Sequence, residues 1–205
     1  MKILLLAPPR RFWPFISDND NFILPQNLPC LASPLVKEGF SVRIIDCLPL
    51  KMGWSSLESF LKDYRPDVVG IGENHALYCD EVLKAFALCK KIDPAVVTVA
   101  GGTHFSSLAD DYIDTQNIDF IVVGEGEITL LELARHIASG GRDYAKINGL
   151  VFKDSWRKIH TQPRALVEDL DSLPMPAYDL LPIEKYGRSR YLFYPGGISI
   201  HHGRE

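Results

Sequence analysis

Residues 120–141 have the sequence FIVVGEGEITLLELARHIASGG, and this stretch decides the fold class. Phe120–Val123 is a short apolar run of the kind found in strands that are buried on both faces. A glycine-containing turn follows, and Ile128–Ser139 then places apolar residues at helical spacing along one side. Gly140 and Gly141 stop this helix. The stretch therefore predicts a strand, a turn and a helix, the repeating unit of an α/β domain.

Four earlier stretches share the continuous apolar character of Phe120–Val123. They are Ile3–Ala7, Val42–Ile45, Val68–Ile71 and Val96–Ala100. Together the five runs predict an open, doubly wound α/β domain with a five-stranded parallel sheet and right-handed crossovers. The commonest strand order for such a sheet is 2-1-3-4-5, and its ligands bind beyond the carboxyl ends of the strands.

The segments between these strands favour helices. Leu31–Glu38 precedes a glycine stop signal, and Asp80–Lys91 carries an apolar stripe. Ser55–Glu58 has the spacing of a capping box. The helix that it begins is expected to end near Arg65, because Pro66 disfavours helical geometry in the preceding residue.

The pattern changes after Gly141, so we expect an α/β domain over residues 1–141 and a separate C-terminal part over residues 142–205. In the latter, Gly149–Phe152 and Lys158–His160 predict a β-hairpin. The prolines of Leu173–Pro182 then predict an extended linker.

Gly197–Ile200 is a further candidate strand, and the sequence stops five residues later, at Glu205. A strand at this position has no partner in the sequence after it. We therefore expect the end of the chain to be a cut made inside a longer protein.

Composition and charge narrow the function classes. The 205 residues include 22 basic and 26 acidic side chains, for a net charge of −4, and 46% of them are hydrophobic. This slightly acidic balance argues against a broad nucleic-acid interface, which needs a basic face. The aliphatic run Ile3–Ala7 is far shorter than the roughly 20 residues of a membrane-spanning helix, and no signal-peptide cleavage site follows it. We expect a cytoplasmic protein without nucleic-acid or membrane partners.

The reactive side chains show no catalytic or metal-binding spacing. No Ser or Cys stands at a strand-turn-helix elbow, and His201 and His202 would point to opposite faces of a strand. The cysteine spacings match no zinc or iron–sulfur motif, so we expect reduced and mostly buried thiols. The sequence thus predicts no catalytic residue and no protein metal ligand. The four cysteines are Cys30, Cys47, Cys79 and Cys89.

A loop of over 20 residues follows the first predicted strand and contains Pro9, Arg10, Phe12 and Trp13. Loops of this length inside a compact domain are usually functional. Its aromatic residues could cover a large flat ligand, or they could form a lid that packs on its own domain.

Three glycine-containing loops follow later strands at the same edge. Glycine allows a ligand to approach the backbone closely, but it also suits a tight strand-to-helix turn. The carboxylates of the third loop would repel a phosphate, so this loop favours the hydroxyls or ring nitrogens of a neutral ligand. The loops are Gly72-Glu73-Asn74-His75, Gly101-Gly102-Thr103-His104 and Gly124-Glu125-Gly126-Glu127.

These motifs together resemble the N-terminal cobalamin-binding domain of the B12-binding radical S-adenosylmethionine (SAM) enzymes. The resemblance covers nearly the whole chain. It implies a flavodoxin-like fold and a role as the cobalamin module of a methyltransferase that acts on unactivated carbon, or of a cyclase of the anaerobic magnesium-protoporphyrin ester type. The residues that carry it are Val69–Gly72, Val99–His104, Asp119–Thr129, Asn148–Val151 and the linker-like Leu170–Leu181.

The resemblance also implies which residues bind the cofactor. The corrin would lie over the carboxyl edge and the nucleotide tail would run toward the loops after strands 3 and 4. Pro9, Arg10, Phe12 and Trp13 would approach the corrin, and Gly101 and Gly102, followed by Thr103 and His104, would flank the tail. The pocket would be lined by Gly72, Glu73, Asn74 and His75 and by Gly124, Glu125 and Gly126.

Three family motifs are absent. No histidine follows an Asp at the spacing of the cobalt-ligating Asp-x-His-x-x-Gly motif, and Gly72 stands at the Ser of the associated Ser-x-Leu motif. We therefore expect no protein histidine on cobalt. The Cys-x3-Cys-x2-Cys motif is also missing, so the [4Fe-4S] cluster and SAM would belong to a radical SAM barrel beyond Glu205, and the fragment alone should catalyse nothing.

One alternative function stays open at this point. A domain of the same lineage could have lost cobalamin and could serve as a non-catalytic docking or scaffold module. Phosphorelay receivers and flavodoxins are disfavoured, because Ala7-Pro8-Pro9 stands where a receiver needs acidic residues and a flavodoxin needs a phosphate loop.

Overall fold

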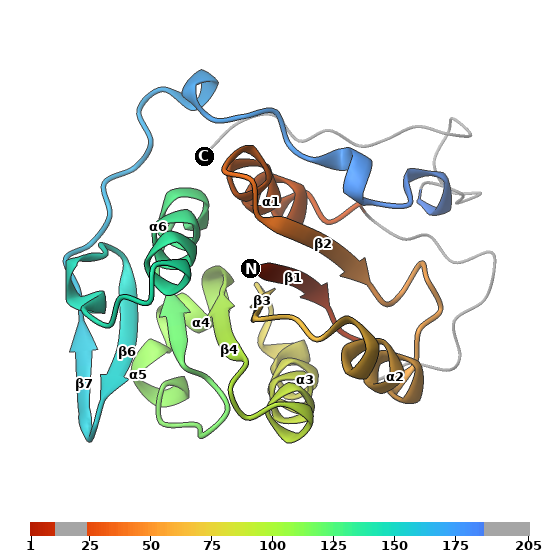
Figure 1. Ribbon diagram of the computed structural model, residues 1–205, viewed down its shortest axis with the longest axis horizontal. Coiled ribbons are helices and arrows are strands. Elements are labelled where there is room, and N and C mark those ends of the chain that lie inside the picture. The colour runs from red at the N-terminus through yellow and green to blue at the C-terminus, as the bar shows by residue number, and fades with distance from the viewer. Residues whose placement is uncertain (11–23, 187–205) are drawn as a thin grey trace.

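The computed structural model describes residues 1–10 and 24–186 and contains a seven-stranded sheet with strand order β2-β1-β3-β4-β5-β6-β7 (Figure 1). The first five of these strands are parallel. The α/β class and the predicted order 2-1-3-4-5 are confirmed. The parallel strands are β1 (Lys2–Ala7), β2 (Ser41–Asp46), β3 (Val68–Gly72), β4 (Val97–Gly101) and β5 (Phe120–Val122).

The predicted hairpin is confirmed as β6 (Leu150–Asp154) and β7 (Arg157–His160). It continues the main sheet, because β6 pairs antiparallel with β5 through the partners Val122 and Leu150. Leu150 and the two residues after it are buried, so the pairing covers an apolar edge of β5. The expected division of the chain at Gly141 stays a prediction.

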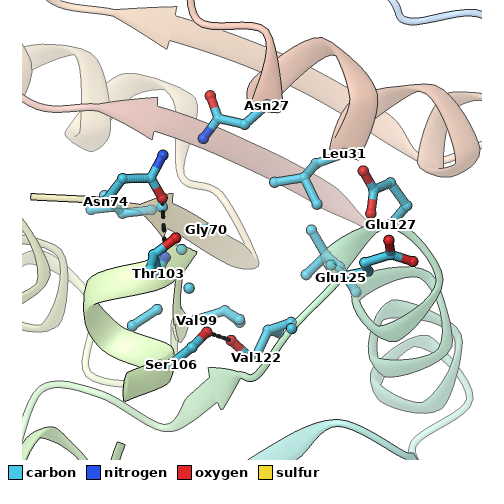
Figure 2. A pocket seen from close by; sticks show the side chains of 18 of the residues that line it. Asn27, Leu31, Gly70, Asn74, Val99, Thr103, Ser106, Val122, Glu125 and Glu127 are labelled. Atoms are coloured by element: carbon cyan, nitrogen blue, oxygen red, sulfur yellow. Dashed lines mark hydrogen bonds between the residues drawn. The ribbon is translucent and has the colours of Figure 1, made fainter. Parts of the chain in front are cut away.

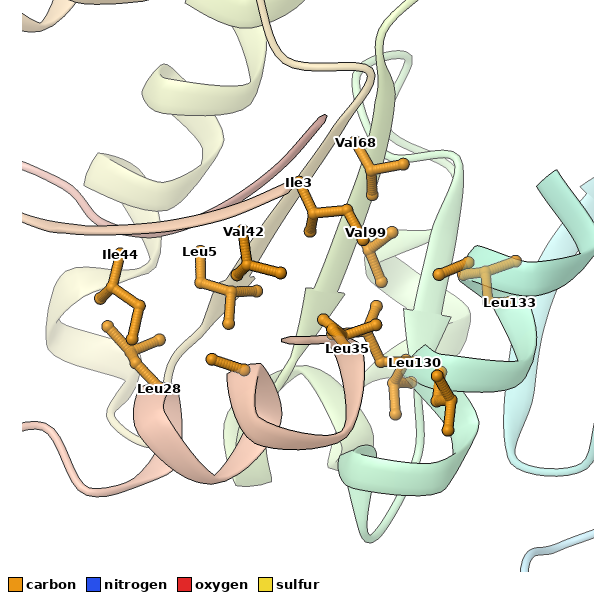
Figure 3. Packing of buried hydrophobic residues seen from close by; sticks show 14 of the residues in the cluster. Ile3, Leu5, Leu28, Leu35, Val42, Ile44, Val68, Val99, Leu130 and Leu133 are labelled. Atoms are coloured by element: carbon orange, nitrogen blue, oxygen red, sulfur yellow. The ribbon is translucent and has the colours of Figure 1, made fainter. Parts of the chain in front are cut away.

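Helices cover both faces of the sheet, as the apolar strands require. One core cluster joins α1 and α6 to Ile3, Leu5 and Val99 of the sheet (Figure 3). A second cluster, which includes Leu57 and Phe86, joins α2, α3, α4 and α5 to the other face. The helices are α1 (Asn27–Lys37), α2 (Trp54–Tyr64), α3 (Cys79–Ile92), α4 (Gly102–Ser107), α5 (Ala109–Tyr112) and α6 (Gly126–Ala138).

Helix α1 begins four residues before the predicted start at Leu31. Pro29 lies in its first turn, where the backbone N–H has no helical partner to lose. Pro34 lies inside the helix and has no backbone N–H to donate to the carbonyl oxygen of Cys30. That oxygen accepts a hydrogen bond from Ser33 Oγ instead, at 3.1 Å. Neither proline therefore ends the helix.

Helix α2 ends at Tyr64, as Pro66 predicts, with Arg65 in the left-handed region. The predicted capping box is wrong, because Gly53 is the N-cap residue and no side chain caps the helix. The short helices α4 and α5 were not predicted, since elements of six and four residues are too short to show helical periodicity in the sequence.

The segment after β7 crosses the molecule beside α1 toward β2 (Figure 1). Residues 161–186 contain only short 3₁₀ turns, so the predicted absence of a helix from Leu173–Pro182 is confirmed. Ala177 N–H donates to Pro29 O at 3.1 Å, and Tyr186 donates to Asp46 at 3.0 Å. The 3₁₀ helices of the described residues are η1 (Ala76–Tyr78), η2 (Tyr144–Lys146), η3 (Leu170–Ser172), η4 (Tyr178–Leu180) and η5 (Ile183–Lys185).

Across residues 1–10 and 24–186, no helix combines the length and the apolar character needed to cross a bilayer. The candidate strand Gly197–Ile200 lies outside the described residues.

Candidate functional site

A cavity of about 480 Å³ opens at the carboxyl edge of the sheet, between α1, α4 and α6 (Figure 2). This is the edge at which doubly wound sheets bind their ligands. Residues of β3, β4 and β5 form its floor. Eight of the predicted site residues line it, and they are Gly72, Asn74, Gly101, Gly102, Thr103, Gly124, Glu125 and Gly126.

Glycines at the strand ends keep this edge hollow. A Cβ atom on Gly70 would lie 3.0 Å from Leu5 Cδ2, and one on Gly126 would lie 2.7 Å from Leu31 Cδ2. At Gly101 a Cβ atom would meet nothing closer than Val122, at 3.8 Å, so the space beside this glycine is open. Side chains at these positions would narrow the cavity or displace its walls.

Gly102 has a different role, because the backbone itself requires it. Its φ is +85°, and a Cβ atom would lie 2.5 Å from the carbonyl oxygen of Glu73. The backbone of Gly102 thus packs directly against the loop after β3. Two hydrogen bonds join the start of α4 to this loop: Thr103 N–H donates to Asn74 Oδ1 at 3.0 Å, and His104 N–H donates to Glu73 O at 3.2 Å. Gly102 therefore shapes the cavity wall through the fold.

Glu73 is buried and does not line the cavity. Its carboxylate accepts hydrogen bonds from the backbone N–H groups of Asn74 and His75, at 2.9 and 3.0 Å, and pairs with Arg10 at 2.5 Å. The Arg10 guanidinium also lies over the ring of Tyr78, 4.3 Å from its centroid. These contacts fix the loop after β3 against the end of β1.

The other predicted site residues that the structure describes also lie away from the cavity. Pro9 and Arg10 stand at the end of β1, and His75 is exposed. His104 turns away, with its Nε2 atom 2.8 Å from the hydroxyl of Tyr112 on α5. Phe12 and Trp13 lie outside the described residues.

The described residues bring no three His, Cys, Asp or Glu side chains together in a way that could hold a metal ion. All four cysteines lie in the described part of the chain and are free thiols. Burial raises the pKa of the Cys47 and Cys89 thiols. It also raises the pKa of Cys30, to which the negative charge of Glu127 makes a smaller contribution.

A buried acid, Asp46, lies at the carboxyl end of the edge strand β2. Burial raises the pKa of Asp46 to about 6. Hydrogen bonds from the backbone N–H of Leu48 and the hydroxyl of Tyr186, together with the positive charge of Arg10, lower this pKa and offset part of the rise. The Tyr186 hydroxyl donates to Asp46 Oδ2 at 3.0 Å. This bond holds the C-terminal segment against the carboxyl edge.

Sequence reasoning missed the cavity residues that come from the covering helices. Asn27, Leu28 and Leu31 of α1 and Leu130 of α6 all line it. A signal was available, because strand order 2-1-3-4-5 with right-handed crossovers puts the helices after strands 1 and 5 on the same face. Two helices on one face, with the ends of strands 3 and 4 between them, enclose a cleft.

The chain is similar to several known proteins. The family model of the B12 binding domain matches residues 20–134. An uncharacterized methyltransferase, PH0819, of Pyrococcus horikoshii is 35% identical over 91% of this chain and 40% of its own length. The anaerobic magnesium-protoporphyrin IX monomethyl ester cyclase of Synechocystis sp. is 26% identical over 91% of this chain and 37% of its own.

Among solved structures, the radical SAM methyltransferase TsrM of Kitasatospora setae, with cobalamin and a [4Fe-4S] cluster bound, superposes with a TM-score of 0.66. It is 24% identical, and the match covers 80% of this chain and 31% of that one. The chain thus spans about two fifths of the length of the curated relatives that it matches.

Proposed function

This chain belongs to the family of B12-binding domains, and we propose that it holds cobalamin at the carboxyl edge of its sheet, with the nucleotide tail in the cavity between α1 and α6. The observation that carries this proposal is the cavity itself. It lies where the fold binds ligands, and glycines rather than side chains form much of its wall.

The residues present fit a cofactor with a bulky tail. A cavity of about 480 Å³ falls within the range of roughly 300–1,000 Å³ that is usual for small-molecule sites. Leu31, Val99 and Val122 offer an apolar surface to a base, and Asn27 and Thr103 stand at the mouth beside Asn74. The corrin ring would lie outside, over the strand ends near Pro9 and Arg10.

When bound, the cofactor supplies a cobalt centre that can carry a methyl group. The chain's own part is to bind and orient it. The Glu73–Arg10 pair and the Gly102 contact hold the loop after β3 in place, and the Tyr186–Asp46 bond keeps the C-terminal segment against the same edge. No histidine occurs between Pro8 and Pro29, so we infer that the lower face of the corrin meets no imidazole from this loop.

For the whole protein we propose a B12-dependent radical SAM enzyme, either a methyltransferase or a cyclase. The relatives that support this include both kinds. The [4Fe-4S] cluster and SAM would be held by a radical SAM barrel in another part of the whole protein. We place the protein in the cytoplasm, a location in keeping with four free cysteines.

The test is retention of hydroxocobalamin by the purified apo chain in gel filtration, with Leu31→Trp as a blocking variant. Leu31 points into the cavity (Figure 2), so an indole there should occupy the space for the tail. Val36→Trp, on an exposed position of the same helix, is the matched control.

We expect a coloured one-to-one complex with the parent chain and with Val36→Trp, and a much weaker one with Leu31→Trp. If the colour elutes only with free ligand while circular dichroism shows a folded chain, the docking or scaffold function is favoured instead.

A further inference from the structure

The inner wall of the cavity is aliphatic. Leu5, Val99, Val122 and Leu130, all buried, belong to the core cluster under α1 and α6 and also line the cavity. Leu31 adds its side chain from α1 (Figure 2). Among the described lining residues, each one that is buried is aliphatic or glycine.

The polar side chains of the lining are engaged elsewhere or stand at the mouth. Ser106 Oγ donates to the carbonyl oxygen of Val122 at 3.2 Å. Glu125 Oε2 accepts from the backbone N–H of Val167 at 2.8 Å. Glu127 is half-buried in the first turn of α6, and Glu125 is the half-buried N-cap residue of that helix. Exposed polar side chains complete the mouth, namely Asn27, Asn74, Thr103 and Ser107.

From this wall we infer that the site is selective for the lower base of its corrinoid and takes a benzimidazole in preference to a purine. The inference rests on the proposed function and deepens it. Cobamides share the corrin ring and differ in this base. The outer edge of dimethylbenzimidazole carries two methyl groups, whereas the corresponding edge of adenine has a ring nitrogen, with the amino group on the carbon beside it.

The selectivity follows from desolvation. The transfer of methyl groups from water to an aliphatic wall is favourable. The amino group and ring nitrogen of adenine would lose their water without finding partners on Leu5, Val99 or Leu130, and an unpaired buried polar group is costly. Discrimination by an apolar pocket reaches about 10- to 100-fold, so we expect a difference of that size in Kd.

The experiment titrates the apo chain with three corrinoids in their aqua or hydroxo forms: cobalamin, the adenine-containing cobamide, and cobinamide, which has no base. We expect cobalamin to bind at least about tenfold more tightly than either of the others. Equal Kd values for cobalamin and the adenine cobamide, or tighter binding of the latter, would overturn the selectivity.

The three-way comparison also separates this inference from the proposed function. If cobinamide binds as tightly as cobalamin, the base does not use the cavity, and the inference fails while corrinoid binding stands. If the folded chain binds none of the three, the proposed function fails, and the inference fails with it.

A pair of variants tests whether the cavity wall determines the selectivity for the base. Leu31→Gln adds an amide that can pair with the edge of adenine, and Val36→Gln makes the same change on the outer side of α1. We expect Leu31→Gln to narrow the ratio of the two Kd values several-fold and Val36→Gln to leave it unchanged. An equal effect of both variants, or none from Leu31→Gln, would contradict an assignment to the cavity wall.

Discussion

Two neighbouring glycines at the end of β4 should respond to substitution in opposite ways. Gly102→Ala places a methyl group 2.5 Å from the backbone oxygen of Glu73, at a φ of +85°. The left-handed backbone costs about 1–2 kcal/mol, and the contact with a fixed backbone atom adds strain of about 1–3 kcal/mol. A loss of about 3 kcal/mol should lower the Tm of a chain this size by roughly 10 °C.

Gly101→Val should leave the fold intact, because the φ of Gly101 is extended and its Cβ atom would have ordinary contacts with Val122 at 3.8 Å. Its methyl groups would instead take up cavity space. Overpacking costs about 1–3 kcal/mol, so cobalamin should bind about 5- to 150-fold more weakly.

Thermal melts and corrinoid titrations of both variants are the assay, with Ala95→Val, in the turn before β4, as the control. Ala95 is exposed, so its variant should match the parent chain in both measurements. A Gly102→Ala chain with an unchanged Tm would refute the backbone argument. A folded Gly101→Val chain with unchanged affinity would refute the placement of the ligand.

The other predictions concern polar groups at the carboxyl edge of the sheet and the cobalt of the bound cofactor. The pKa of Asp46 is raised to about 6, so the folded chain binds a proton that the unfolded chain releases near pH 4, and stability should fall by about 2–3 kcal/mol as pH rises from 4 to 6. Urea unfolding should show this fall, and Asp46→Asn should flatten it; an unchanged slope would contradict the assignment. Arg10→Met should destabilise the chain by about 3 kcal/mol by leaving the Glu73 carboxylate unpaired, with partial rescue by adding Glu73→Gln; urea melts that match the parent would show that the pair is dispensable. Electron paramagnetic resonance of the bound Co(II) form should show no splitting from a protein nitrogen, and splitting that persists with cobinamide would identify a protein ligand.

The sheet and the hollow at its carboxyl edge were predictable because continuous apolar runs and glycine-rich strand ends are local features of the sequence. The start of α1 was not, because Pro29 and Pro34 look like helix breakers until their neighbours are known. In the structure Pro29 occupies a first turn, and Ser33 satisfies the carbonyl that Pro34 frees. Both facts depend on the local register of the helix.

The side chains around the cavity were harder to predict than the cavity itself. His104 follows Gly102 in a loop-like stretch, but the stretch forms the short helix α4 and turns the imidazole toward Tyr112. Glu73 looked like a ligand contact and is instead buried against Arg10, 63 residues away in sequence. Such orientations arise from tertiary contacts, which local patterns do not encode.

The central claim is that the cavity between α1 and α6 receives the nucleotide tail of cobalamin. A crystal structure of the chain with hydroxocobalamin tests it most directly. The account predicts electron density for the base against Val99 and Leu130, with the corrin over the carboxyl edge. A corrinoid bound elsewhere, with the base outside this cavity, would contradict it.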